Sequence, residues 1–263
     1  MVTLILVIYK TDKNKLNKLL KIIGNKYKLI IIDNSYNYNF SKVRIPKSTE
    51  IIRSKNIGNG SGINIGIKKC KTRFAIYLDI DVEFEKNFLK KFINYTKMVK
   101  NFSVLVPNHG KFKKDKKLIN NYVGEASVML YNIRVVKNLG FFDKNYFLYF
   151  EETDFLLRSK RKQFNTFLIP NLKIKHKRAS SIKKSENIDL LRSWHYMWSM
   201  FYFYKKNYTY FEALKKVSKL MIKDIIMLFF YSIILDKKNC KLRFYRLFGV
   251  ISSMIGLKSF LRP

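Results

Sequence analysis

The sequence predicts an α/β fold in which a mostly parallel sheet is flanked by helices and followed by a C-terminal helical extension. Strand-length apolar runs alternate with amphipathic stretches over roughly the first two-thirds of the 263 residues. Successive residues of these runs are apolar, which is typical of parallel strands buried on both faces. Beyond about residue 183 the pattern becomes helical without strands. We therefore expect an α/β domain over residues 1–182 and a helical extension over residues 183–263.

The predicted elements of the α/β domain follow one another in a regular order. The first apolar run, residues 2–9, leads into a helix with aliphatic residues on one face that ends at Gly24. Four further strands are expected at residues 28–33, 49–54, 73–79 and 103–107, and helices at residues 60–70 and 85–100. The pattern then loosens, with strands at residues 125–132, 165–170 and 172–177 and helices at residues 133–140 and from about Glu151 onward.

The charge balance is the most unusual property of the composition. The chain has 53 Lys and Arg against 18 Asp and Glu, a formal net charge of +35. Such an excess suits an anionic partner, whether nucleic acid, an anionic membrane face or a phosphorylated substrate. The longest apolar runs, residues 2–9 and 225–235, are too short to cross a bilayer. Together with only two cysteines, this predicts a cytoplasmic protein that is soluble or attached to a membrane surface.

Two carboxylates follow the predicted strand at residues 73–79. Asp79 and Asp81 flank a single apolar residue at the carboxyl end of that strand, where open α/β sheets bind ligands. Both can reach one hard cation, and such a cation stabilises a leaving diphosphate. A solvated strand end is the plain alternative, because short D-x-D strings also occur by chance.

A glycine-rich segment, residues 56–70, surrounds a predicted helix start. Backbone amides at such a start favour phosphate. The spacing of Gly58, Gly60 and Gly62 does not fit a dinucleotide-binding fingerprint. A tight turn before a helix is the structural alternative.

Three acids, Glu151, Glu152 and Asp154, stand together behind an aromatic run in an otherwise basic chain. Carboxylates beside apolar rings have a raised proton affinity and suit general-base catalysis. The alternative is that they offset the macrodipole at a helix start. His176 follows a short predicted strand, whereas His109 and His195 have no comparable context.

Several ordered motifs carry a family resemblance. They comprise residues 4–9 with 30–35, the N-x-G…N-x-G segment of Asn56, Gly58, Asn64 and Gly66, and the strand with Asp79 and Asp81. The last motif, residues 140–158, contains G-x-F-D and an acidic pair followed by D…R. Taken together, they resemble the inverting family 2 glycosyltransferases of GT-A type, in particular the rhamnosyltransferase-like branch. The resemblance covers residues 2–182.

The resemblance implies a set of functional residues. Asp81 would bind Mn²⁺ or Mg²⁺, with Asp79 and His176 as further ligands. Glu152 would be the general base, but it stands where the family has aspartate, so Glu151 and Asp154 remain alternatives. Arg158 would hold the donor diphosphate or the local fold, and Asp33 would recognise the nucleobase. The donor-binding set is Tyr9, Asp33, Asn56, Gly58, Asn64, Asp79 and Arg158.

The resemblance also implies partners. The expected donor is a dTDP- or UDP-linked sugar, and the expected acceptor is a glycan or a polyprenyl-diphosphate-linked glycan in cell-surface polysaccharide synthesis. The extension, residues 183–263, suits an anionic membrane surface, and the alternative is that its helices pack against the catalytic domain or against a second subunit in a homodimer. We therefore expect a peripheral protein on the cytoplasmic face of the inner membrane.

A basic nucleic-acid-binding α/β protein without catalytic activity is the alternative function. It would explain the net charge, but no helix-turn-helix, zinc-finger or ribonucleoprotein motif is visible, so no specific nucleic acid is expected. A sugar-nucleotide pyrophosphorylase fits poorly, because residues 9–16 after the first strand contain no glycine.

Overall fold

The computed structural model describes residues 2–113, 115, 117–177 and 185–263. The chain divides into two compact units. The first comprises Met1–Phe142 and Phe155–Lys183, and the second comprises Asp143–Asp154 and Lys184–Pro263. The expected domain boundary between residues 182 and 183 lies outside the described residues. The division also groups Asp143–Asp154 with the C-terminal helices, although sequence reasoning assigned this segment to the α/β domain.

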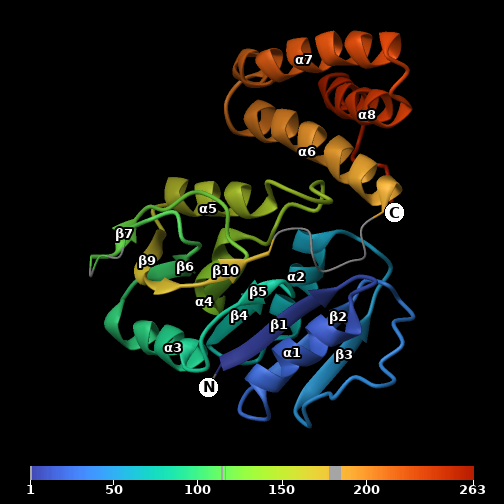
Figure 1. Ribbon diagram of the computed structural model, residues 1–263. Coiled ribbons are helices and arrows are strands. Elements are labelled where there is room, and N and C mark those ends of the chain that lie inside the picture. Colours follow the sequence, from blue (N-terminus) through green and yellow to red (C-terminus); the bar gives the residue numbers. More distant parts are fainter. Residues whose placement is uncertain (1, 114, 116, 178–184) are drawn as a thin grey trace. The chain divides into compact units, whose positions relative to one another are not determined.

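The first unit is built on an eight-stranded sheet with the order β3-β2-β1-β4-β8-β6-β9-β7 (Figure 1). Its strands are β1 Val2–Ile8, β2 Lys28–Asp33, β3 Thr49–Arg53, β4 Phe74–Leu78, β6 Phe102–Asn108, β7 Ile119–Asn120, β8 Val128–Asn132 and β9 Asn165–Lys173. β8 runs antiparallel to β4 and β6, and β7 runs antiparallel to β9. The other pairs are parallel, so the prediction of a mostly parallel sheet is confirmed.

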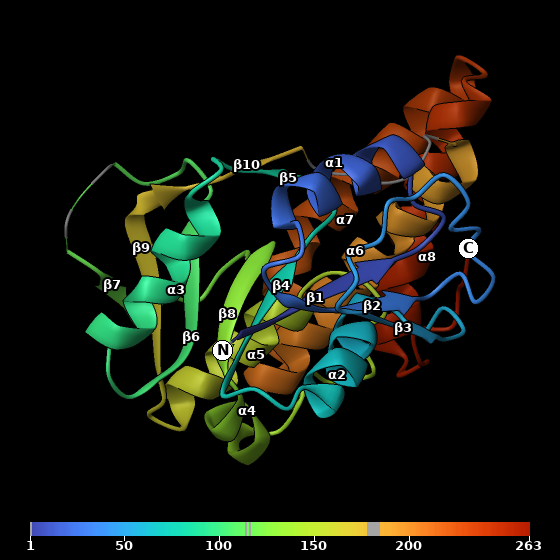
Figure 2. The same ribbon diagram turned by 90° about the horizontal axis from the view of Figure 1, so that it is seen from below.

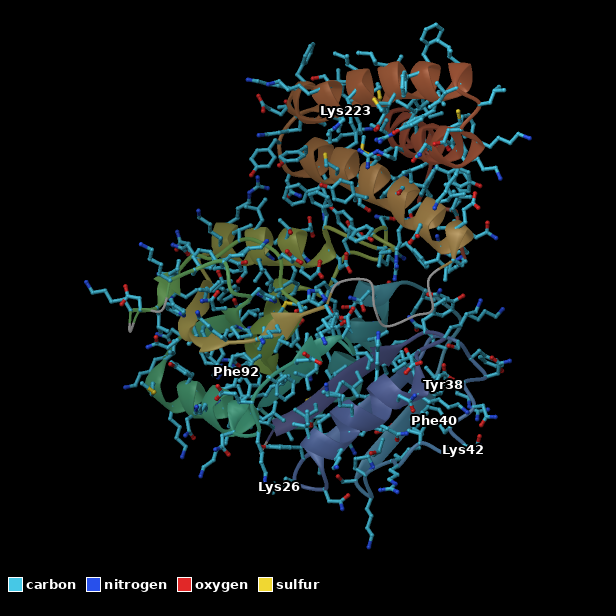
Figure 3. All side chains as sticks on the ribbon, in the orientation of Figure 1. Lys26, Tyr38, Phe40, Lys42, Phe92 and Lys223 are labelled. Atoms are coloured by element: carbon cyan, nitrogen blue, oxygen red, sulfur yellow. The ribbon has the colours of Figure 1, made fainter. Side chains whose placement is uncertain are left out.

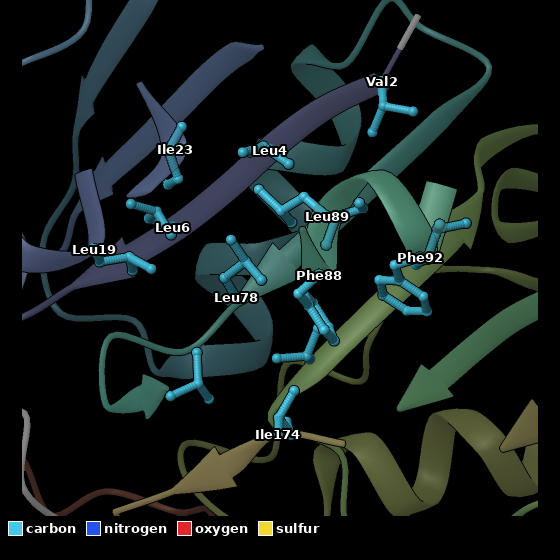
Figure 4. Close-up of a cluster of buried hydrophobic side chains, with 14 of the residues drawn as sticks. Val2, Leu4, Leu6, Leu19, Ile23, Leu78, Phe88, Leu89, Phe92 and Ile174 are labelled. Atoms are coloured by element: carbon cyan, nitrogen blue, oxygen red, sulfur yellow. The ribbon is translucent and has the colours of Figure 1, made fainter. Parts of the chain in front are cut away.

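Helices cover both faces of this sheet (Figure 2). Along β1, Leu4 and Leu6 belong to a buried cluster that also contains residues of α1 (Lys13–Ile23) and α3 (Phe88–Met98) (Figure 4). Ile5, between them, belongs to a second cluster with residues of α2 (Asn59–Lys69) and α4 (Ile133–Leu139). Because alternate side chains of a strand point to opposite faces, this arrangement explains why nearly every residue of β1 is apolar.

Two glycines allow α2 to lie directly against β1. A Cβ at Gly66 would come within 2.5 Å of Ile5 Cγ2, and one at Gly62 within 2.8 Å of Val7 Cγ1. Neither glycine has a positive φ, so closeness rather than backbone conformation requires them. The glycine-rich segment thus has a packing function in its helical part.

The chain after β2 closes back over α1. The Tyr38 hydroxyl donates to Thr11 O at 2.8 Å. The Tyr38 and Phe40 rings meet edge to face with centroids 4.9 Å apart (Figure 3). These contacts fix the connection that leaves Asp33 at the carboxyl edge of the sheet.

Three helices make up most of the second unit: α6 (Glu186–Asn207), α7 (Tyr210–Ile233) and α8 (Lys237–Met254). Met197, Phe201, Val217 and Val250 form their core. Close approach of α8 to α6 requires Gly249, where a Cβ would lie 2.3 Å from Trp194 O. Within the described part of the chain, no helix combines the length and the apolarity that crossing a bilayer requires.

Candidate active site

Asp79 and Asp81 follow β4 directly, at the carboxyl edge of the sheet. A two-stranded ribbon of β5 (Val82–Glu83) and β10 (Lys175–His176) then brings a distant segment to them. Its register pairs His176 with Val82, and Lys177 N donates to Asp81 O at 3.0 Å. The ribbon therefore places the imidazole of His176 beside the carboxylate of Asp81.

Asp79, Asp81 and His176 each offer one ligand atom, and these atoms lie within 4.8 Å of one another. His176 Nε2 is 3.1 Å from Asp81 Oδ1 and 3.8 Å from Asp79 Oδ2. The exposed fractions of the side chains are 26% for Asp79, 7% for Asp81 and 15% for His176. The group is thus shielded but reachable from solvent, and the structure brings together the three residues predicted as metal ligands.

The carboxylates of Asp79 and Asp81 lie close enough to repel each other, and this changes the proton affinity of the group. Burial and the neighbouring charge of Asp81 raise the pKa of Asp79 to about 7. Burial by itself would lower the pKa of His176, but the nearby Asp81, Asp79 and Glu125 outweigh it and raise that pKa. Two crowded carboxylates with one imidazole therefore favour a bound positive charge.

The donor set fits a divalent metal ion. Carboxylate oxygens are the ligands that Mg²⁺ and Mn²⁺ prefer, and an imidazole nitrogen is acceptable to Mn²⁺. A cation here would relieve the repulsion that raises the pKa of Asp79. Asp79, Asp81 and His176 are thus suited to hold such an ion.

Side chains that the sequence did not single out surround the group. The Tyr77 hydroxyl donates to the Asp79 carboxylate and lies 3.0 Å from Asn59 Oδ1. Glu125 Oε1 lies 3.8 Å from His176 Nδ1. His109 Nε2 accepts from Ser127 N at 3.1 Å, and its ring centroid is 6.4 Å from that of His176. His109 directly follows β6, so its place at a strand's carboxyl end could have indicated it.

Four of the predicted donor-binding residues lie at or just after the carboxyl ends of β1, β2 and β3 or at the start of α2: Tyr9, Asp33, Asn56 and Gly58. Asp33 is fully buried, and its carboxylate accepts from Ser35 N at 2.8 Å and from Tyr38 N at 2.9 Å. Gly58 adopts φ 91 at the N-cap of α2, a conformation that favours glycine. Tyr9 and Asn56 lie in the loops after β1 and β3. Asp33 thus shapes the turn in which a nucleobase contact was predicted.

Asn64 and Arg158, also predicted to bind the donor, make contacts within the fold. The Asn64 amide donates to Phe142 O and accepts from Phe142 N, both at 2.9 Å. Arg158, on α5 (Glu151–Arg161), donates to Phe141 O at 2.8 Å and lies over the Phe155 ring. Both side chains hold residues 141–142, which agrees with the structural role considered for Arg158.

Glu151, Glu152 and Asp154, which we call the acidic segment, lie in the second unit. Side chains of α6 hold this segment. The Asp154 carboxylate is fully buried and pairs with Lys206 Nζ at 2.8 Å and Asn207 Nδ2 at 3.0 Å. Lys206 also pairs with Asp143 at 2.8 Å, and Ser199 Oγ donates to Leu148 O at 2.8 Å. The sequence did not predict this function of α6, because Lys206 and Asn207 lie far from the motif along the chain.

Glu151 and Glu152 open α5 directly after a strained backbone. Tyr149 and Phe150 have φ 69 and φ 66, in the left-handed region. Such conformations in non-glycine residues are unfavourable and concentrate at functional sites. Glu151 is 1% exposed, whereas Glu152 is half-buried. Glu152 is therefore the more accessible of the two glutamates.

Comparisons with known proteins agree with this architecture. The sequence profile of glycosyl transferase family 2 matches residues 5–159, whereas no curated protein sequence matches the chain. GalNAc-T7, solved with UDP, GalNAc and Mn²⁺, is similar at TM-score 0.57 and 13% identity, over 79% of this chain and 50% of that one. This chain therefore spans half the length of GalNAc-T7.

Two further structures match over most of their own length. The mannosyltransferase PcManGT from Pyrobaculum calidifontis, solved with GDP-Man and Mn²⁺, has TM-score 0.58 at 9% identity, covering 96% of this chain and 86% of that one. S. aureus TarS 1–349 has TM-score 0.54 at 11% identity, covering 97% and 91%. At such identities the likeness concerns the fold, which is GT-A-like, and the profile match extends over more than half of the sequence. The chain therefore belongs to glycosyl transferase family 2.

Proposed function

We propose that the chain transfers a sugar from a nucleoside-diphosphate donor to an acceptor hydroxyl with inversion at the anomeric carbon, assisted by Mn²⁺ or Mg²⁺. The observation that supports it most is the group of Asp79, Asp81 and His176 at the carboxyl edge of the sheet. A non-catalytic nucleic-acid-binding protein would leave this group without a function.

Asp79, Asp81 and His176 would hold the metal ion, which when bound supplies positive charge that stabilises the leaving diphosphate. The neighbouring side chains would orient these ligands. The Tyr77 hydroxyl fixes the Asp79 carboxylate, and Glu125 lies on the far side of the His176 ring. Such support is what ligand orientation in a metal site requires.

Glu152 is our choice for the general base. It would take the proton of the acceptor hydroxyl as that oxygen attacks the anomeric carbon, while the bond from this carbon to the diphosphate oxygen breaks. One displacement of this kind inverts the configuration. The partial exposure of Glu152 supports this assignment, and the ion pair of Asp154 with Lys206 argues against Asp154. An acceptor hydroxyl would have to displace Lys206 or Asn207 from the buried Asp154 carboxylate to reach it.

The donor and acceptor follow from the resemblance and from charge. UDP and GDP-Man are present in the similar structures GalNAc-T7 and PcManGT, which supports a nucleotide-sugar donor here. A dTDP- or UDP-linked sugar, the rhamnosyltransferase-like branch and a glycan or polyprenyl-diphosphate acceptor stay predictions. The net charge of +35 supports an anionic acceptor at the cytoplasmic face of an anionic membrane.

A donor panel tests the proposal. The full-length chain is incubated with dTDP-rhamnose, UDP-hexoses, UDP-N-acetylhexosamines or GDP-mannose, with Mn²⁺ or Mg²⁺ and lipid-linked acceptors, and the released nucleotide is measured. Asp81→Ala should lower metal-dependent release by roughly a hundredfold or more and weaken Mn²⁺ binding. Glu85→Gln, at an exposed position outside the group, is the matched control. Unchanged release by the Asp81 variant would contradict the metal assignment.

A further inference from the structure

The C-terminal half of α7 has the reverse of the usual amphipathic arrangement. Its apolar side chains point to solvent, and with the turn that follows they form a surface that we call the α7 apolar face. These residues are 49–80% exposed: Ile222, Ile225, Ile226, Phe229, Phe230, Ile233, Ile234 and Leu235. Figure 3 shows side chains projecting from α7 on the side turned away from α6 and α8. A helix packed in a water-soluble bundle normally turns its apolar side inward.

A buried ion pair fixes this orientation. Asp224 is 1% exposed and accepts from Arg243 Nη1 at 2.8 Å and Arg246 Nε at 2.7 Å, both on α8. Rolling α7 to bury its apolar side chains would break these contacts and leave charges unpaired, which is strongly unfavourable. The α7 apolar face is therefore held outward by the packing of α7 on α8.

Cations lie at both ends of the α7 apolar face. Lys215 and Lys219 continue the stripe of Ile222, Ile226 and Phe229 toward the N-terminus of the helix, because a spacing of four and three residues keeps positions on one side. At the other end, exposed lysines open α8: Lys237, Lys238 and Lys241. The surface thus combines an apolar centre with a positive rim.

Its charge discriminates among possible partners. Residues 210–263 contain 11 Lys and Arg against three Asp and Glu. A second copy of the chain would bring the same positive charge to the contact, and nucleic acid would leave the isoleucine and phenylalanine side chains in water. An anionic lipid surface offers phosphate to the lysines and hydrocarbon to the apolar centre.

We propose that the α7 apolar face inserts into the interface of an anionic phospholipid membrane, with Lys215, Lys219 and the lysines that open α8 contacting lipid phosphates. Because the exposed apolar residues follow one side of α7 along its length, α7 would lie along the membrane plane. This docking deepens the proposed membrane location of the acceptor. It arises from the second unit and does not depend on glycosyl transfer.

Vesicle sedimentation of the full-length chain tests the proposal. Wild type should bind phosphatidylglycerol vesicles at low salt and phosphatidylcholine vesicles much more weakly. The double substitution Ile226→Ser with Phe229→Ser should lower the partition coefficient roughly tenfold or more. Lys215→Gln with Lys219→Gln should lower it about thirtyfold on phosphatidylglycerol. All four side chains are exposed, so folding should be retained.

Matched controls come from α3 in the first unit. Met98→Ser removes an exposed apolar side chain, and Lys90→Gln with Lys97→Gln removes two exposed charges. Both control variants should bind phosphatidylglycerol vesicles as wild type does. Loss of binding in these controls equal to that in the α7 variants would overturn the assignment of the surface.

Three further outcomes would overturn the proposal. The Ile226/Phe229 variant could partition onto vesicles as wild type does, or wild type could bind both lipids equally. Alternatively, wild type could be a dimer and this variant a monomer, with neither binding vesicles. The last would assign the surface to a second copy. Nucleotide-sugar binding, measured in parallel, should be the same in wild type and the α7 variants. A chain that binds vesicles but no nucleotide-sugar would contradict the proposed function and leave the docking surface intact.

Discussion

At the scale of single residues, the two aspartates after β4 are held in different ways. Asp81 is nearly buried, its carboxylate lies beside His176, and its carbonyl accepts from Lys177 N. Asp79 is more exposed and is oriented by Tyr77. A metal ligand needs a fixed position, whereas a group that contacts the donor needs access. Asp81 is therefore the better candidate for a metal ligand alone, and Asp79 for a residue that contacts both the metal ion and the donor.

The same scale separates the candidates for the base. We expect Glu152→Gln to lower kcat by at least about a hundredfold, because the amide cannot accept the hydroxyl proton, with donor affinity and unfolding midpoint near wild type. Asp154→Asn should instead lower the free energy of unfolding by about 2 kcal/mol, because Lys206 and Asn207 lose a charged partner. Turnover assays and urea denaturation measure the two effects.

Glu151→Gln completes the comparison, since Glu151 precedes Glu152 on the same helical turn but is buried. If this variant loses turnover while Glu152→Gln retains it, the base is Glu151. Full turnover in all three variants would contradict a carboxylate base from this segment.

At the scale of elements, the glycine-rich segment combines two functions. Its first turn, at Gly58, presents backbone amides at a helix start, where phosphate binds readily. Its later glycines let α2 approach β1. The helix start is thus held at the sheet edge by packing one and two turns further along.

Gly66→Ala probes that packing. The new methyl group would meet Ile5 at a distance that no Cβ tolerates, so α2 must shift away from β1. We expect a loss of about 1–3 kcal/mol in the free energy of unfolding and a weaker donor affinity, measured by urea denaturation and nucleotide binding. In an Ile5→Ala background, Gly66→Ala should lower the free energy of unfolding by less than it does in wild type. An equal loss in both backgrounds would contradict the contact between residue 66 and Ile5.

At the scale of the whole molecule, the C-terminal segment is tied to α6 by a buried histidine. His195 Nε2 donates to Leu261 O at 3.0 Å, and Ser259 Oγ donates to His195 Nδ1 at 3.2 Å. Burial lowers the pKa of His195 to about 4 from an ordinary 6.5. The neutral ring is therefore the form that the folded chain requires.

This shift predicts a pH dependence of stability. Between pH 6.5 and about 4 the unfolded chain binds a proton at this position and the folded chain does not. The contribution of neutral His195 to the free energy of unfolding is therefore fully present above pH 6.5. It is lost as the pH falls through that window, by up to about 3 kcal/mol. The free energy of unfolding, measured by urea denaturation at several pH values across the window, should depend less steeply on pH for His195→Gln than for wild type. Equal slopes would contradict the shift.

Much of the fold was predictable, because apolar runs, helical periodicity and capping residues act locally. The α1 helix begins after Asp12, whose side chain accepts from Asn14 N and Lys15 N, and ends at Gly24. The parallel core of the sheet and the group of Asp79, Asp81 and His176 were also expected. The antiparallel placement of β8 between β4 and β6 was not, because strand order depends on long-range pairing.

The sequence by itself determined the kinds of groups available: two carboxylates and an imidazole in a fixed order, a glycine-rich helix start, an acidic segment and a basic helical extension. The tertiary structure decided which of them meet at the carboxyl edge of the sheet and which are engaged in contacts within the fold. Asn64 and Arg158 hold backbone carbonyls, and Asp154 pairs with Lys206. The physical reason is that burial and partner choice depend on contacts between residues far apart along the chain, which local patterns do not encode.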